Sequence, residues 1–262
     1  MTTETRTVVI AGGGRGLGRC IGERLGQSGW GVGVLARTAS QVEEAADAIR
    51  DGGGKAIGLS VDVLDTPALE RAMERVAGWC GGHIDALVVT AGQLRGIGPT
   101  LSVDADRAWR DLETSVRGSW NAARAVWPWL KDSPRGSITF LVGPGLNGDL
   151  AFGSLYGAAQ AALARLVESL AVELRESDVR VYALNPGLVP TGLVQHLLDS
   201  EEGRRWLPRF TEAFAEGKEV GPEVAAEMAD WLLDHRPEEV SGRVIAAPST
   251  PEILETRLKT IA

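Results

Sequence analysis

The stretch Ala11-Gly12-Gly13-Gly14-Arg15-Gly16-Leu17-Gly18 decides the fold, because it joins an apolar run at residues 7–11 to a helical pattern at residues 17–28. Glycine lets the backbone turn sharply and approach another group closely, since it lacks a Cβ atom. The free N–H groups at the start of the following helix favour an anion such as a phosphate. A strand, a glycine-rich turn and a helix in this order predict a dinucleotide site. The alternative is a tight turn that binds nothing.

Short apolar runs alternate with helical patterns from this turn onward. Further strands are expected at residues 31–35, 55–61, 86–90, 137–142, 179–184 and 242–246. Helices are expected at residues 40–50, 67–79, 104–130 and 152–176 and again from residue 221, with an irregular helical stretch at residues 191–217. Continuous apolar strands separated by helices predict βαβ units whose sheet is covered on both faces. We therefore expect an α/β fold: a single Rossmann domain over residues 1–262, with a doubly wound, seven-stranded parallel sheet and helices on both faces.

The composition excludes several other classes of protein. Glycine supplies 33 of 262 residues without a Gly-X-Y period, which excludes collagen. A net charge of −8 argues against a general nucleic-acid binder. No apolar run reaches the ~18 residues that span a membrane, and no signal peptide is visible. The two cysteines and three histidines have no metal-ligand spacing. We expect a cytoplasmic protein that binds no metal, membrane or nucleic acid.

The end of the second expected strand refines the dinucleotide site. An acidic residue there, about 20 residues after the first glycine, would bind the ribose 2′-hydroxyl of NAD. The strand instead ends Leu35-Ala36-Arg37, with Ala36 where that acid would stand. Arg37, together with Arg15 from the turn, can pair with a 2′-phosphate. This pattern favours NADP(H) over NAD(H); the alternative is that both arginines are merely exposed.

Several motifs together resemble the short-chain dehydrogenase/reductase family, over almost the whole chain. Gly12, Gly16 and Gly18 fit the family's Gly-xxx-Gly-x-Gly turn, and Asp62 fits the residue that contacts the adenine. Thr90-Ala91-Gly92 resembles the Asn-Ala-Gly turn, and residues 185–191 resemble the segment that closes over the nicotinamide. The resemblance implies these cofactor-binding residues: Gly12, Gly14, Arg15, Gly16, Leu17, Gly18, Arg37, Asp62, Val63, Ala91, Gly92, Gln160, Pro186, Gly187, Val189 and Thr191.

The catalytic pattern departs from that family. The family uses an Asn, Ser, Tyr and Lys tetrad, and here only the tyrosine, Tyr156, is present. Gln160 stands in place of the lysine, Gly143 in place of the serine and Ser115 in place of the asparagine. Without a nearby cation, the pKa of Tyr156 is expected to stay near the ordinary value of ~10. A tyrosine that is a poor base remains a usable acid, so the pattern favours reduction over alcohol oxidation.

Three functions remain open at this point. The first is an NADP(H)-dependent reductase in which Tyr156 donates the proton to a substrate that needs little polarisation. The second is a non-redox enzyme, such as a cyclase, isomerase or lyase, in which Tyr156 acts as a general acid with Asn147, Ser115 or His196. The third is a cofactor-binding protein without catalysis. The candidate catalytic residues are Tyr156, Ser115 and Asn147.

The resemblance also implies a substrate pocket, a lid and an oligomer. The lid is expected at residues 188–220, and residues 248–262 form a C-terminal tail that looks like a short amphipathic helix. A largely apolar pocket suits a mid-sized hydrophobic metabolite. Four tryptophans on the fourth helix are expected to pack in the core or in an interface, and the fourth and fifth helices are expected to form a homodimer or homotetramer. The expected pocket residues are Gln93, Leu94, Gly143, Gly145, Leu146, Phe152, Leu188, Leu193, His196 and Trp206.

Overall fold

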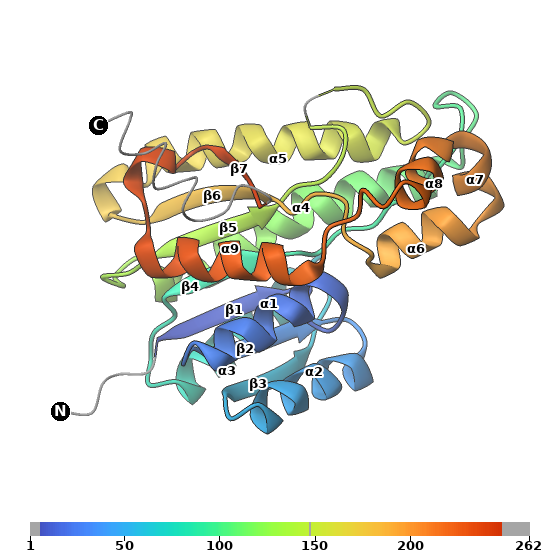
Figure 1. Cartoon of the computed structure of the whole chain (residues 1–262). Coiled ribbons are helices and arrows are strands. Elements are labelled where there is room, and N and C mark those ends of the chain that lie inside the picture. Colours follow the sequence, from blue (N-terminus) through green and yellow to red (C-terminus); the bar gives the residue numbers. More distant parts are fainter. Residues whose placement is uncertain (1–5, 147, 248–262) are drawn as a thin grey trace.

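The computed structural model describes residues 6–146 and 148–247 and contains one parallel sheet (Figure 1). Its seven strands have the order β3-β2-β1-β4-β5-β6-β7. The strands are β1 (Thr7–Ala11), β2 (Gly31–Ala36), β3 (Lys55–Ser60), β4 (Ala86–Val89), β5 (Ser137–Leu141), β6 (Arg180–Asn185) and β7 (Val244–Ala246). The predicted doubly wound, seven-stranded parallel sheet is confirmed.

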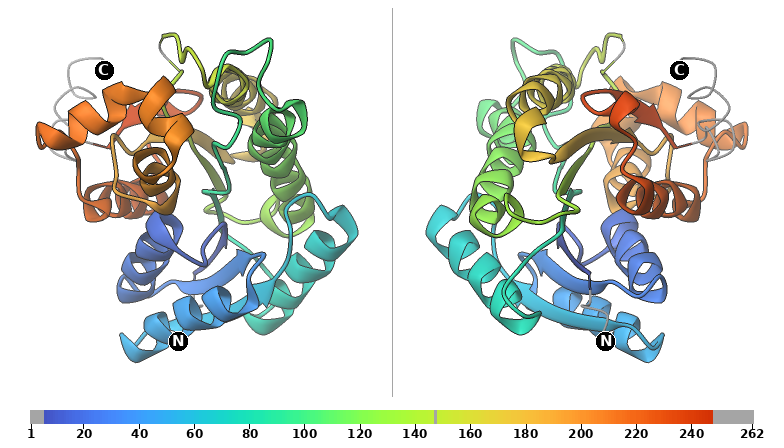
Figure 2. Two further views of the ribbon diagram at one scale, coloured as in Figure 1. Left: turned by 90° about the vertical axis from the view of Figure 1, so that its right-hand side faces the viewer. Right: turned by 90° about the vertical axis from the view of Figure 1, so that its left-hand side faces the viewer.

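Helices cover both faces of the sheet, which gives three layers (Figure 2). Helices α1, α2 and α9 lie on one face and α3, α4 and α5 on the other, so the apolar strands are buried from both sides. The helices are α1 (Gly16–Gln27), α2 (Ala39–Asp51), α3 (Thr66–Trp79), α4 (Ala105–Leu130), α5 (Ser154–Glu173), α6 (Gly192–Asp199), α7 (Glu201–Trp206), α8 (Pro208–Ala215) and α9 (Pro222–His235).

The order of the strands positions the site. From β1 the chain winds outward to β2 and β3, and it then returns to β4 on the other side of β1. The connections therefore diverge at the carboxyl ends of β1 and β4, where a crevice opens in folds of this kind. The glycine turn follows β1 directly, so the sequence that decides the fold also lies at this crevice.

The stretch expected to be irregularly helical consists of three short helices, α6, α7 and α8, beyond the carboxyl ends of the strands (Figure 1). Ser200 is extended and separates α6 from α7, and its hydroxyl accepts a hydrogen bond of 3.1 Å from the Gly203 N–H. Pro208 then begins α8 at a position where a missing N–H costs nothing. The last strand is shorter than expected, because Gly242 turns the chain with a φ of +81° before it.

Two expectations concern surfaces rather than the sheet. Trp109 and Trp120 on α4 are 60% and 45% exposed, whereas Trp127 and Trp129 pack against the core. Helix α4 also packs along α5, but the predicted homodimer or homotetramer stays a prediction.

Within the described ranges no helix is long and apolar enough to cross a membrane, and the cytoplasmic location stays a prediction. The expected tail helix lies outside the described residues.

Candidate active site

The glycine turn leaves the start of α1 open to an anion. Arg15 is the N-cap of α1, but its side chain makes no capping hydrogen bond, and the first turn contains no acidic residue. A Cβ at Gly12, whose φ is +102°, would lie 2.5 Å from Thr90 Oγ1 and 2.7 Å from the Ala91 nitrogen. A Cβ at Gly18 would lie 2.5 Å from the Gly12 carbonyl oxygen. Glycine is therefore required at both positions, and the turn presents backbone N–H groups rather than side chains.

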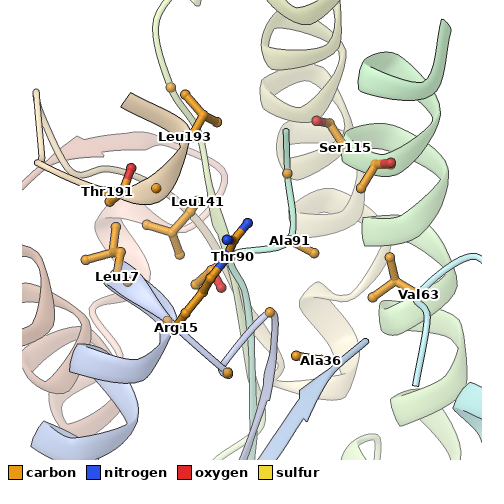
Figure 3. A pocket seen from close by; sticks show the side chains of 18 of the residues that line it. Arg15, Leu17, Ala36, Val63, Thr90, Ala91, Ser115, Leu141, Thr191 and Leu193 are labelled. Atoms are coloured by element: carbon orange, nitrogen blue, oxygen red, sulfur yellow. The ribbon is translucent and has the colours of Figure 1, made fainter. Parts of the chain in front are cut away.

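A cavity of about 310 Å³ lies above this turn. Thr191 and Leu193 lie on one side of it, and Ser115 and Val63 lie on the other (Figure 3). Thr114 Oγ1 and Ser115 Oγ are buried in its wall without a hydrogen-bond partner in the described part of the chain. Unpaired buried hydroxyls and a glycine cradle fit a dinucleotide, which supplies phosphate and ribose oxygens.

The cavity brings together most of the residues that the sequence marked for the cofactor. Gly187 lines a neighbouring cavity instead, and Val189 is buried at 3% exposure without reaching either. The marked residues in the wall of the dinucleotide cavity are Gly12, Gly14, Arg15, Gly16, Leu17, Gly18, Arg37, Asp62, Val63, Ala91, Gly92, Gln160, Pro186 and Thr191.

The two arginines next to the end of β2 are available for a phosphate. Both Arg15 and Arg37 line the cavity, and in the described ranges neither guanidinium has an ion pair or a hydrogen bond. Ala36, which ends β2 and lines the same cavity, offers no competing charge. Asp62 already uses one of its carboxylate oxygens, because Oδ1 accepts a 3.0 Å hydrogen bond from the Leu64 N–H.

Tyr156 and Gly143 occupy one space between them. Tyr156 is 7% exposed and lines the cavity from the first turns of α5. A Cβ at Gly143 would lie only 2.5 Å from the tyrosine hydroxyl oxygen. The hydroxyl therefore fills the volume that the side chain of the family's serine would need. The absence of the serine and the position of the tyrosine are therefore linked, because a side chain at position 143 would collide with the Tyr156 hydroxyl.

Gln160 holds the loop after β5 against α5. Its side chain is 3% exposed, and Oε1 accepts a hydrogen bond of 2.9 Å from the Gly143 N–H. A lysine could not accept this bond, because an ammonium group only donates. The amide nitrogen of Gln160 keeps its two hydrogens for the cavity that it lines.

The expectation of an ordinary pKa for Tyr156 is wrong. Burial, and then the charge of Asp111, raise the pKa of Tyr156 far above its usual value. Asp111 lies on α4, is itself buried, and accepts hydrogen bonds of 2.7 Å from the N–H groups of Arg95 and Gly96. The sequence could not show this burial, since Tyr156 is buried in a cluster of apolar side chains from separate segments. This lid cluster contains Leu94, Ile97, Leu150, Tyr156, Leu197, Leu207 and Phe210, with Phe152, Leu188, Leu193 and Trp206 packed against it.

The raised pKa of Tyr156 predicts that the folded protein shows no tyrosinate absorbance at a pH where an exposed tyrosine would ionise. The chain has two tyrosines, and burial also raises the pKa of Tyr182, whose hydroxyl donates to the Pro237 carbonyl over 3.2 Å. A spectrophotometric titration of the folded protein is expected to show no tyrosinate at about pH 10, where both titrate after unfolding. Because the raised pKa favours the neutral form only in the folded state, the free energy of unfolding is expected to fall as the pH rises past this point. A transition near pH 10 in the folded protein would contradict the described burial.

Restoring the family's serine is expected to destabilise this protein. In Gly143→Ser the new Cβ meets the Tyr156 hydroxyl, and such overpacking costs about 1–3 kcal/mol of unfolding free energy. The control is the same substitution in a Tyr156→Phe background, where the opposing oxygen is gone and most of the loss should disappear. Urea unfolding of the four proteins measures this coupling, and equal losses in both backgrounds would show that the two groups do not compete.

The marked substrate residues do not share one wall. Gly143 and Leu193 line the dinucleotide cavity, whereas Gln93 and His196 line a second cavity. A third cavity is lined by Gly145, Leu146 and Leu188. The side chains of Leu94, Phe152 and Trp206 belong to the lid cluster, and the Phe152 and Trp206 rings pack at a centroid distance of 4.8 Å. Among the candidate catalytic residues, Ser115 and Tyr156 share the first cavity and Asn147 lies outside the described residues.

The sequence reasoning missed several residues near the site. Asp111 stands four residues before Ser115, so helical spacing could have placed the two on one face of α4. Thr114 directly precedes Ser115 and lines the same cavity. No local pattern marked Arg95 or Arg107, because the loop and the helix that carry them meet only in the folded chain.

Comparisons with known proteins agree with this geometry. Residues 6–202 match the short chain dehydrogenase family. A short chain dehydrogenase of Pseudocercospora fijiensis is 31% identical over 192 residues, which are 72% of this chain and 62% of that protein. A tropinone reductase homolog of Arabidopsis thaliana is 28% identical over 80% of each chain. Among solved structures, the KRED1-Pglu enzyme has a TM-score of 0.82 at 26% identity and covers 92% of this chain and 100% of its own. Levodione reductase has a TM-score of 0.84 at 23% identity over 93% and 96% of the two chains, which shows the fold. The chain belongs to the short chain dehydrogenase family, whose members are oxidoreductases that use nicotinamide cofactors.

Proposed function

We propose that this protein is an NADPH-dependent reductase in which Tyr156 donates a proton to the substrate. The observation that carries the proposal is the Tyr156 hydroxyl, which lines a cavity that fits a dinucleotide and whose pKa burial raises further above neutral pH. A group held in its acid form suits the reductive direction, in which the substrate oxygen gains a proton. The name of one relative, a tropinone reductase homolog, supports the same direction.

The roles of the other residues follow from their positions. The N–H groups of the glycine turn and the start of α1 hold the pyrophosphate, and Arg15 and Arg37 hold a 2′-phosphate. Gln160 donates its amide hydrogens to ribose hydroxyls. Ser115 Oγ, which has no hydrogen-bond partner among the described residues, is available to bind the substrate oxygen beside Tyr156. When bound, NADPH supplies the hydride.

The missing serine narrows the substrate class. Gly143 has no hydroxyl to polarise a carbonyl, so substrates with an electron-poor acceptor are favoured: activated carbonyls, iminium ions and conjugated alkenes.

The packing of α4 along α5, with exposed Trp109 and Trp120, supports a homodimer or homotetramer through these helices.

The test is the loss of NADPH absorbance in the presence of α-keto esters, cyclic diketones, iminium salts and enones. Oxidation with at least one of these classes is expected. Tight NADPH binding without oxidation by any class would favour the non-redox alternative, in which Tyr156 acts as a general acid alone. The absence of NADPH binding would favour a protein without this cofactor chemistry.

A further inference from the structure

A second cavity of about 610 Å³ opens beside the dinucleotide cavity. Three parts of the chain form its walls: the loop after β4, the first turns of α4, and the lid helices α6 and α7. The lining residues are Gln93, Arg95, Ile97, Asp106, Arg107, Arg110, His196 and Glu202.

Neighbouring residues of the same three segments line the second cavity and the first one. On the loop after β4, Gly92 lines the first cavity and Gln93 the second. On α6, Leu193 lines the first and His196, one turn later, the second. On α4, Ser115 faces the first cavity, and Arg107 lies eight residues earlier, which corresponds to about 12 Å along a helix. A substrate that reaches Tyr156 and Ser115 can therefore extend into the second cavity.

Two arginines in the wall of this cavity have guanidinium groups that are unpaired among the described residues. In the parts of the chain that the structure describes, the guanidinium groups of Arg95 and Arg107 make no ion pair and no hydrogen bond. Arg110 differs, because it is shared between Asp62 at 3.5 Å and Glu113 at 3.4 Å. Unpaired guanidinium groups that share a pocket are suited to bind a carboxylate or a phosphate.

The positive charge also acts on His196 across the cavity. Burial, followed by the charges of Arg95 and Arg107, lowers the pKa of His196, while Glu202 acts in the opposite direction. Asp106 and Glu202 line the cavity, but neither forms an ion pair with Arg95 or Arg107 in the described ranges. The cavity wall carries three arginines, of which Arg110 is the shared one, and two acids, whereas the whole chain carries a net charge of −8.

We propose that the second cavity is a subsite for an anionic group of the substrate, held by Arg95 and Arg107, the latter about 12 Å along α4 from Ser115. The substrate is then an organic acid or a phosphate monoester with an apolar middle section, rather than a wholly apolar metabolite. The inference that this group belongs to a reducible substrate rests on the proposed function. Carboxylate and phosphate have the same recognition chemistry here, so the two are separated by experiment.

The test measures binding by calorimetry on the full chain with NADPH present. The probes are 9-oxodecanoate, its methyl ester, 8-oxononyl phosphate, and 3-oxobutanoate as an acid that is too short to span the two cavities. We expect the long acid or the phosphate to bind about ten-fold more tightly than the ester, with the preference shrinking at high salt. The tighter of these two anions identifies the group, and the short acid is expected to gain nothing from its charge.

The variant Arg95→Gln/Arg107→Gln is expected to abolish this preference while NADPH binding stays unchanged. Arg71→Gln, on the exposed face of α3 and outside the cavity, is the matched control and should keep the preference. Equal binding of acid, phosphate and ester, or a preference that survives the double substitution, would overturn the subsite. Because binding needs no turnover, anion preference together with no NADPH oxidation by any of the activated substrates named under the proposed function would remove the reductase and leave the subsite. Oxidation of NADPH by a protein that binds the acid and the ester equally would support the reductase and overturn the subsite.

Discussion

Replacing Tyr156 by phenylalanine is expected to lower kcat by about 10²–10⁴-fold, the usual contribution of a positioned general acid. The affinity for NADPH should stay unchanged, because the glycine turn and the two arginines that hold the phosphates lie on other elements of the cavity wall. The ring itself is retained, so its packing in the lid cluster is preserved. The measurement is the steady-state rate of NADPH oxidation together with the dissociation constant of NADPH for each protein.

Tyr182→Phe is the matched control for this change. Tyr182 is also buried, but its hydroxyl donates to the Pro237 carbonyl away from the cavity. Its removal should cost about 1 kcal/mol of unfolding free energy and leave kcat as it was. Unchanged turnover in Tyr156→Phe would remove Tyr156 from the chemistry and would favour a different proton source.

Removing Arg15 of the glycine turn and Arg37, which follows β2, is expected to produce the largest change in cofactor binding. The variant Arg15→Gln/Arg37→Gln should weaken NADPH binding by about 10²–10⁴-fold, since it removes two hydrogen bonds to a charged group and each is worth about 1.5–3 kcal/mol. NADH has no 2′-phosphate, so its affinity should change little. The ratio of the two dissociation constants, measured by fluorescence titration, checks the preference.

Arg19→Gln is the control for this second prediction. Arg19 lies on α1 close to the turn, but its guanidinium is paired with Glu23 at 2.7 Å and it is not part of the cavity wall. Its loss should leave both cofactors unaffected. Equal weakening of NADPH and NADH by the double variant would mean that the arginines support the turn itself and do not select a phosphate.

Local sequence patterns predicted the parts of the site that depend on neighbouring residues. The strand run, the glycines and the helix start are contiguous, and the doubly wound parallel sheet followed from the alternation of apolar runs and helices. Most residues marked for the cofactor share one cavity for this reason, since carboxyl ends of parallel strands meet at one edge. The motif spacing also placed Gly143, Tyr156 and Gln160 in one place.

Features that depend on contacts across the fold could not be predicted in this way. The substitution of glycine for serine at position 143 looked like a simple loss, but the structure shows the tyrosine hydroxyl in the vacated space. The high pKa of Tyr156 depends on the lid packing over it. Leu94, Phe152 and Trp206 have apolar side chains of the kind that lines a pocket, yet they pack against one another, which only the three-dimensional arrangement decides.

The most direct test of the central claim is the fate of deuterium carried at the nicotinamide C4 of NADPH. In a single turnover with the activated carbonyls and enones named above, we expect one of the two C4-deuterated forms to deliver its label to the reduced carbon of the product. Tyr156→Phe should suppress this transfer while NADPH remains bound. Firm NADPH binding with no label in any product would contradict the reductase.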